Sequence, residues 1–336
     1  MSAPRRSALF AAAACLPAAF CLSLCVGRYP LTLSSVLASL TGSADMAAQV
    51  FWRLRLPRAL AAMLAGAALG TGGAVYQAVF SNPLAAPDIM GVSGGATLGA
   101  AAAIVFFGGA GETALAFAGG LAALLLALLL TRASGARGAS APGDARGTAA
   151  IVLSGVLVSA LVRAALTVLK LLADTDGELA AIEFFTMGSF SGITVRALPP
   201  MLAGVLPGLI VLALLRRQIA LLTLAPEEAA SLGVNVNAMR ALVLGAATLG
   251  VCAVSAQTGV IAFAPLIAPH GARLLLGGRS RGRLALSALL GAVLLLLADT
   301  AARLVPGAEL PVSVFTTALG VPLLVFLMRK GGRSDA

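Results

Sequence analysis

Long apolar segments recur along almost the whole chain and are separated by short polar connections. Of the 336 residues, 60% are hydrophobic and only 11% are charged, whereas soluble domains carry about 25% charged residues. A water-soluble fold with this composition would leave large apolar patches exposed. About 20 apolar residues in a helix span the hydrocarbon core of a bilayer. The sequence therefore predicts an all-α, polytopic membrane protein.

Ten apolar segments are long enough to be membrane-spanning helices. The first resembles a secretory signal peptide, but neither Cys21 nor Cys25 follows the small residue that a lipoprotein cleavage site needs. We therefore interpret it as an uncleaved helix. A weaker segment, Ile182 to Phe190, predicts a short helix between the fifth and sixth spans. The predicted spans are Ala8–Val26, 58–80, 89–107, 113–131, 148–172, 197–215, 238–258, 260–277, 284–305 and 312–328.

The basic residues favour one orientation in the membrane. Cytoplasmic connections of membrane proteins carry an excess of Lys and Arg. With the N-terminus inside, fifteen of the 23 basic residues lie on the cytoplasmic side and six on the outer side, while Arg163 and Lys170 fall within the fifth span. We therefore expect both termini in the cytoplasm. The net charge of +10 resides mainly in the connections, so it indicates membrane topology and not a nucleic-acid partner.

The chain contains an internal repeat. A shift of 182 positions aligns Pro83–Pro87 with Pro265–Pro269, and residues 58–91 then share nine identities with residues 240–273. Because the copies begin five spans apart, they lie in opposite orientations, as in many transporters. We predict one transmembrane domain, 1–336, with repeats at about 58–172 and 240–328. Coincidence in a low-complexity chain is the alternative.

The residue inventory argues against an enzyme. His270 is the only histidine, so no histidine cluster can bind zinc or non-haem iron, and we expect a structural role for it. Neither lysine stands in the G-K-[ST] loop that binds the phosphates of ATP. The spans also hold no paired acid and base. We therefore predict no catalytic residue, no metal site and no cofactor on this chain.

Several motifs in a fixed order resemble one family of transport proteins. They are Arg55-Leu56-Pro57-Arg58, Gln77, Asn82-Pro83-Leu84, Gly91-Val92-Ser93-Gly94-Gly95-Ala96, Met187-Gly188-Ser189, Ala229 through Gly233, Pro269-His270 and Glu309-Leu310-Pro311. Together they resemble the FecCD-type permeases of ABC importers for iron–siderophore complexes, haem and cobalamin. The resemblance covers the chain from Arg53 to the last span.

The resemblance implies both a fold and a set of partners. The fold is that of type II importer permeases, in the bacterial inner membrane. The expected partners are a second permease subunit, two cytoplasmic ATPase subunits that bind ATP and magnesium, and a periplasmic substrate-binding protein. One motif departs from the family pattern G-P-I-x-F-x-G-L, since Val260 replaces its proline and Pro265 its glycine. The eighth span is therefore expected to start or bend differently.

A short polar segment between the sixth and seventh spans predicts a helix of about two turns. Pro226 suits the first turn, the acidic pair that follows favours the helix N-terminus, and Gly233 suits the C-terminal exit. So short a helix needs a docking surface to be stable. The resemblance implies that segment 226–233 is the coupling helix that contacts the ATPase; a solvated surface helix is the alternative. Its predicted contact residues are Glu227, Glu228, Ala229, Ser231, Leu232 and Gly233.

Three arginines stand at the outer ends of predicted spans, against the inside-positive trend. They are Arg55 and Arg58 at the second span and Arg303 at the ninth. The resemblance implies that they bind carboxylates of the periplasmic binding protein, for which arginine is well suited. Anchoring to lipid headgroups is the alternative. Asp299 precedes Arg303 by four residues, so we expect it to orient Arg303 within one helix.

Five residues are candidates for the transport pathway or its gate. Arg163 lies near the middle of the fifth span, where a charge costs about 3 kcal/mol unless it meets water or a partner. The resemblance places that span beside the pathway, where Arg163 would meet an anionic cargo; a structural ion pair is the alternative. Asn82 and Pro83 end the second span, as a helix stop or a gate. Gly188 and Ser189 belong to a family motif near the dimer axis.

These observations predict the permease subunit of a binding-protein-dependent ABC importer. The expected cargo is a ferric siderophore, moved from periplasm to cytoplasm by ATP-driven alternating access, because the segment Asn82–Gly91 resembles those family members. Haem and cobalamin are alternatives. An ion-coupled secondary transporter is a more distant alternative, since it would need a carboxylate within the membrane, and Asp299 lies near the outer end of its span.

Overall fold

The computed structural model is all-helical, and each predicted span coincides with one helix. It describes residues 3–27, 29, 31, 46–133, 145–175, 177–224, 226–233, 235–276, 282–305 and 309–331. Six helical stretches among them are long and apolar enough to cross a bilayer. The ten longest described helices are α1 (Ala3–Cys25), α4 (Leu56–Val79), α5 (Val92–Phe107), α6 (Glu112–Ala133), α7 (Ala145–Leu172), α9 (Leu198–Leu214), α12 (Val236–Thr258), α13 (Ala264–Leu276), α14 (Arg283–Leu304) and α15 (Val312–Gly331).

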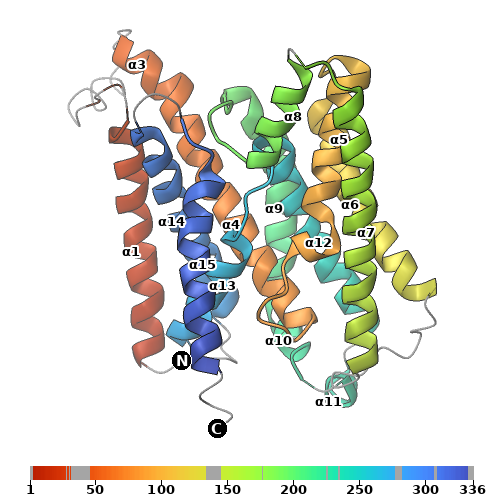
Figure 1. Ribbon diagram of the computed structural model, residues 1–336. Helices are drawn as coiled ribbons and strands as arrows, with labels where there is room; N and C mark the ends of the chain where they lie inside the picture. The colour runs from red at the N-terminus through yellow and green to blue at the C-terminus, as the bar shows by residue number, and fades with distance from the viewer. Residues whose placement is uncertain are drawn as a thin grey trace.

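Short helices cover the two ends of this bundle. They are α3 (Met46–Val50), the π-helical turn η1 (Phe51–Arg55), the 3₁₀ turns η2 (Pro87–Met90) and η3 (Val195–Ala197), α8 (Glu178–Met187), α10 (Arg216–Leu221) and α11 (Pro226–Ser231). Helices α3 and α8 lie at one end, and α10 and α11 at the other (Figure 1). Helix α1 begins and α15 ends at the end that carries α11 (Figure 1). The first and last helices therefore place both termini on one side of the bundle.

Helices α4 and α12, which open the two predicted repeats, pack against each other at the centre and run in opposite directions (Figure 1). Helix α4 of the first predicted repeat also packs against α14 of the second, and α12 of the second packs against α6 of the first. The two predicted repeats therefore pack against each other through several helices. A buried hydrogen bond of 2.7 Å joins the Tyr76 and Thr248 hydroxyl groups across the central pair. Such polar contacts help helices to associate within a bilayer.

The eighth span is shorter than predicted. The expected start at residue 260 was wrong, because α13 begins at Ala264. Gly259 and Phe263 both adopt positive φ angles, of 69° and 62°, which are incompatible with a continuing helix. Pro265 occupies the second helical position, where its missing N–H costs nothing. Thirteen residues give a helix of about 20 Å, less than the hydrocarbon thickness of about 30 Å.

The irregular residues before α13 are stabilised from inside the protein. The backbone N–H of Ala262 donates to Ser313 Oγ at 3.3 Å, and Ser313 Oγ donates to the carbonyl oxygen of Val260 at 2.9 Å. Irregular backbone at membrane depth is tolerated only where protein or a water-filled cavity satisfies it. The start of α15 supplies those partners here.

Helices α4 and α14 cross in backbone contact at a pair of glycines. A Cβ atom on Gly66 would lie 2.1 Å from the carbonyl oxygen of Gly291, and a Cβ on Gly291 would lie 2.1 Å from that of Gly66. No other residue type fits so close an approach, which is a common device for packing helices in membranes. Gly95 of α5 and Gly119 of α6 meet in the same way.

We predict that Gly66→Ala destabilises the protein, because its methyl group would overlap backbone that cannot move aside. The expected loss is about 1–3 kcal/mol, the usual range for overpacking, read as a lower unfolding temperature in detergent. Gly245→Ala is the matched control, since a Cβ on Gly245 meets nothing within 4 Å. The control should be neutral or stabilising by up to about 1 kcal/mol. Equal unfolding temperatures for both variants would contradict the packing argument.

Candidate functional site

The three outer arginines lie together with two acidic residues. Arg58 donates from Nε and Nη2 to Asp299 Oδ1 at 2.9 and 2.8 Å, and from Nη1 to Glu309 Oε2 at 2.8 Å. Arg303 Nε lies 3.2 Å from Asp299 Oδ2. The carboxylate of Asp299 therefore forms ion pairs with two arginines from two helices. The predicted pairing of Asp299 with Arg303 is confirmed. We name Arg55, Arg58, Asp299, Arg303 and Glu309 the arginine cluster.

The arginine cluster also holds the end of α1. Arg303 Nη2 donates to Ser23 Oγ at 2.8 Å, and Arg55 donates to the carbonyl oxygens of Leu24 at 3.3 Å and Tyr29 at 2.9 Å. The last carbonyl groups of a helix lack partners within the helix, and basic side chains commonly satisfy them. The cluster thus ties α1, α4 and α14 together at the end of the bundle that carries α3 and α8.

Burial of these arginines changes what they can contact. Arg55, Arg58 and Arg303 are only 6%, 8% and 4% exposed, and Asp299 is fully buried. Arginines that bind a partner protein or lipid headgroups would normally be exposed, but acceptors of the same chain enclose these three. A cavity of about 260 Å³ opens beside the cluster, and Ser191 and Glu309 contribute to its wall. The docking role of these arginines stays a prediction.

Gly188 and Ser189 lie where three segments meet. The N–H of Ser189 donates to the carbonyl oxygen of Thr258 at 2.7 Å, and the N–H of Val312 donates to that of Gly188 at 3.1 Å. Gly188 has φ +66°, and a Cβ there would lie 2.1 Å from the carbonyl oxygen of Val260. These features require glycine and end α8 at Met187, three residues before the predicted end. The junction connects α8 to the end of α12 and the start of α15.

Asn82 and Pro83 form a turn at the opposite end of the bundle. Helix α4 ends at Val79, and Asn82 Oδ1 accepts a hydrogen bond of 2.9 Å from the N–H of Leu84. This local bond replaces helical bonds that proline prevents. The helix stop is thus confirmed, whereas a gating role stays a prediction.

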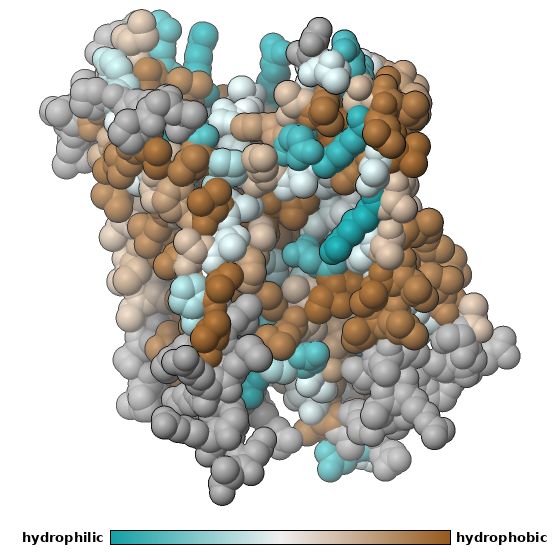
Figure 2. Space-filling model, viewed as in Figure 1, coloured by the Kyte–Doolittle hydropathy of each residue, from teal (hydrophilic) through white to brown (hydrophobic). Residues whose placement is uncertain are grey.

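Arg163 belongs to a polar stripe on α7. Its side chain is exposed, and Ser159, Thr167 and Lys170 lie on the same side of the helix at three- and four-residue spacing. Lys170 Nζ donates to Glu183 Oε1 of α8 at 2.8 Å. The neighbouring side of α7 exposes leucines and valines. Figure 2 shows pale and teal surface between α15 and α7, flanked by brown apolar surface.

A cavity of about 680 Å³ lies beside Ser189, between α5, α6, α8 and α12. Its polar lining includes Glu112, Glu178 and Gln257, and Gln257 Nε2 donates to Thr113 Oγ1 at 3.0 Å. No sequence motif marks these residues, because polar groups at the ends of apolar segments look like ordinary helix ends. Among the described residues, no group of three or more His, Cys, Asp or Glu side chains could hold a metal ion.

The predicted coupling segment forms α11, which lies at the tip of the bundle (Figure 1). The helix covers Pro226–Ser231, two residues short of the predicted end, and Gly233 follows with φ +80°. Ala229 is buried in the core and anchors the segment, whereas Leu232 is 60% exposed. Glu228 and Ser231 are exposed, and the side chain of Glu227 lies outside the described part of the chain. The segment therefore presents both a charge and an apolar side chain.

The sequence matches one known family over nearly its whole length. Residues 15–330 match the model of the FecCD transport family. The chain belongs to this family. It is 37% identical over 312 residues to the ferric enterobactin transport system permease protein FepG of Escherichia coli K12, with 91% of each protein covered.

Other relatives of this FecCD permease carry different names. It is 36% identical over 310 residues to the vitamin B12 import system permease protein BtuC of Vibrio cholerae, covering 91% of this chain and 90% of the relative. It is 32% identical over 327 residues to the molybdate import system permease protein MolB of Haemophilus influenzae, covering 94% of each. The fold matches a solved structure described as an inward-facing metal-chelate type ABC transporter. That match has a TM-score of 0.84 at 32% identity, covering 96% of this chain and 98% of the other.

These findings define the general role of the FecCD permease. It is a multi-pass membrane protein and the permease subunit of an ABC importer, not a catalytic subunit. Permeases of such importers work with an ATPase and a substrate-binding protein.

We predict that Asp299→Asn severely destabilises the permease. The substitution leaves Arg303 buried without a countercharge and Arg58 with Glu309 alone. Breaking a buried pair in this way costs about 3–5 kcal/mol. Glu309→Gln is the matched control, because Glu309 is partly exposed and such a pair is worth at most about 1 kcal/mol. Unfolding temperatures in detergent measure both effects. A milder effect of Asp299→Asn than of Glu309→Gln would contradict the central role of Asp299.

Proposed function

We propose that this FecCD permease imports a ferric siderophore complex across the bacterial inner membrane. It would pair with a second permease subunit, identical or not, around a central pathway and cycle by alternating access. Two cytoplasmic ATPase subunits would bind ATP and magnesium, and a periplasmic binding protein would deliver the cargo. Both termini would lie in the cytoplasm. The exposed Arg163 is the observation on which this proposal rests most.

Arg163 supports a wet pathway along α7. An arginine facing lipid near mid-span costs about 3 kcal/mol, so intramembrane charges normally face a pathway or a partner. The side chain is exposed on this chain, and polar residues continue the stripe to Lys170. A second subunit packed over the face shown in Figure 2 would turn this stripe into the wall of a water-filled channel.

The same charges favour an anionic cargo. The permease with 37% identity is named for ferric enterobactin, and the one with 32% identity is named for molybdate. A basic stripe attracts either anion, so molybdate is the second candidate. The basic stripe gives no such advantage to cobalamin, the cargo named for the BtuC relative. Haem is a further alternative, since it too bears carboxylates.

The cargo can be tested with the complete importer in proteoliposomes, together with its binding protein. We expect uptake of iron-loaded siderophore, and no uptake of molybdate or cobalamin. Arg163→Gln should slow that uptake by about fivefold, as expected for the loss of one charged contact worth about 1 kcal/mol, while basal ATP hydrolysis stays unchanged.

Arg132→Gln is the matched control, because it removes an exposed arginine at the end of α6 and should leave uptake unchanged. Molybdate uptake without siderophore uptake would replace the proposed cargo by the second candidate. Equal rates for the wild type and Arg163→Gln would exclude this residue from the pathway.

Coupling to the ATPase is proposed to occur through α11. The exposed Glu228 of α11 and the exposed Leu232 directly after it suit a groove on a partner. Burying a leucine side chain contributes about 1.5–3 kcal/mol. Leu232→Asp should therefore weaken association with the ATPase by more than about tenfold and abolish cargo-stimulated ATP hydrolysis. Co-purification of the subunits and ATPase assays measure both.

Ala220→Asp on α10 is the control, because it adds the same charge to an exposed position at the same end of the bundle. It should leave association intact. Normal association and stimulation in Leu232→Asp would show that α11 is only a solvated surface helix.

A further inference from the structure

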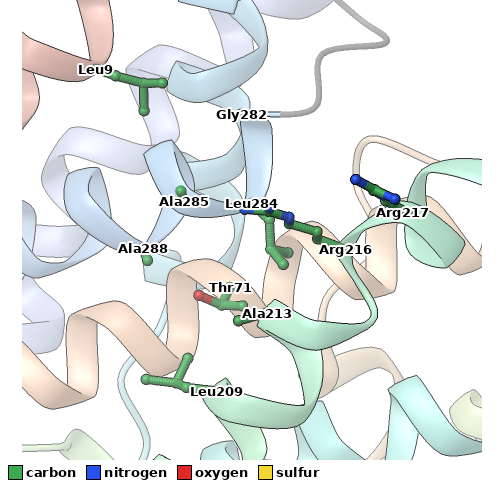
Figure 3. A pocket seen from close by; sticks show the side chains of 10 residues that line it. All are labelled: Leu9, Thr71, Leu209, Ala213, Arg216, Arg217, Gly282, Leu284, Ala285 and Ala288. Carbon is green, nitrogen blue, oxygen red and sulfur yellow. The ribbon is translucent and has the colours of Figure 1, made fainter.

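A third cavity lies at the end of the bundle that carries α10 and α11. It measures about 530 Å³ and lies between α9 and α14, which both pack against α4. Figure 3 shows Thr71 of α4 between Leu209 of α9 and Ala288 of α14; Arg216 and Leu284 line the same cavity. The described residues that line it are Leu9, Thr71, Leu209, Ala213, Arg216, Arg217, Gly282, Leu284, Ala285 and Ala288. None of them belongs to the proposed pathway on α7, α8 and α15.

The lining combines a hydrocarbon wall with two positive charges. Leucines and alanines form the wall, and no acidic residue occurs among the described lining residues. Arg216 and Arg217 are exposed at the rim, and no described carboxylate lies within ion-pair distance of either. A cavity of this size lies in the usual range of ligand pockets, about 300–1,000 Å³.

Thr71 is an independent sign of a polar ligand group. Its side chain is 97% buried, yet Thr71 Oγ1 has no hydrogen-bond partner among the described atoms. A buried hydroxyl group without a hydrogen-bond partner costs free energy. Binding of a group that enters the cavity and accepts a hydrogen bond from this hydroxyl would therefore be favoured. Thr71 and Ala213 line the same cavity, and Arg216 follows Ala213 by three residues, across the break between α9 and α10.

We propose that this cavity binds one anionic phospholipid from the cytoplasmic leaflet. The headgroup phosphate lies between Arg216 and Arg217, and an ester carbonyl accepts a hydrogen bond from Thr71 Oγ1. An acyl chain covers Leu209 and Leu284. Basic pockets between transmembrane helices on the cytoplasmic side suit anionic headgroups. The choice of leaflet rests on the proposed orientation, which places this end of the bundle in the cytoplasm.

The apolar wall distinguishes a lipid from a soluble anion. Inorganic phosphate could reach the two arginines, but it would leave the cavity and the Thr71 hydroxyl unoccupied. An acyl chain fills the apolar volume and removes its surface from water, which is the larger source of binding energy. The lipid would also brace α9 against α14 close to α10, which leads into the coupling segment.

The test uses the delipidated full-length permease in detergent, titrated with phosphatidylglycerol or phosphatidylethanolamine and measured by native mass spectrometry. We expect one tightly bound phosphatidylglycerol per chain, a rise in unfolding temperature on its addition, and no displacement by excess inorganic phosphate. The double variant Arg216→Gln/Arg217→Gln should bind phosphatidylglycerol about 30-fold more weakly, since each basic residue contributes roughly fivefold.

Matched control variants test whether any loss of lipid binding comes from the two arginines and the cavity, or from removing charge or adding bulk anywhere on the protein. Arg132→Gln/Arg196→Gln also removes two exposed arginines, and Ala118→Phe adds a ring to exposed α6; both should bind phosphatidylglycerol like the wild type. Ala285→Phe fills the cavity and should abolish the tight binding. Equal binding of the two lipids, displacement by inorganic phosphate, or wild-type binding in Arg216→Gln/Arg217→Gln would overturn the proposal. None of these measurements involves transport, so failure here leaves the proposed function untouched.

Discussion

The buried ion pair between Arg58 and Asp299 sets the register of the two most intimately packed helices. Buried charges are tolerated only when they are paired and hydrogen-bonded. If α4 slid along α14, Arg58 and Asp299 would each lose the opposite charge or become exposed. Eight residues along α4 from Arg58 and eight residues back along α14 from Asp299, the chain reaches Gly66 and Gly291, whose backbones touch. One turn farther, Gly70 lies against Ser287. The ion pair and the glycine contacts therefore specify one antiparallel alignment.

Much of the fold was predictable from the sequence, because span position depends on local composition alone. All ten spans, the short helix after α7 and the turn at Asn82 follow from apolar runs and from the backbone properties of proline and glycine. The short helix α11 follows from the same local rules. The errors arose at ends that tertiary contacts decide: α13 starts at Ala264 because Ser313 satisfies the backbone before it, and α8 ends at Met187 because Gly188 must approach Val260.

The candidate site was less predictable, because its key contacts join residues far apart in sequence. Arg58 and Asp299 are separated by 241 positions, and Arg58 and Glu309 by 251. A span-end arginine looks exposed when the helix that covers it cannot be placed, so the enclosure of Arg55 and Arg303 by the end of α1 had no local signal. The pairing of Asp299 with Arg303 was foreseeable only because both lie on one helix.

Three arginines in the described part of this membrane protein lie in different environments, and the environment decides what each of the three can do. Arg58 is neutralised by carboxylates of its own chain and therefore contributes to the fold. Arg163 and Arg216 are exposed, but on different surfaces: one on a polar stripe of α7, the other above an apolar cavity with a buried hydroxyl group. A charge over a polar stripe needs water and suits a passing anion. A charge over a hydrocarbon wall needs a ligand that is itself amphipathic, which separates the two sites by chemistry as well as by position.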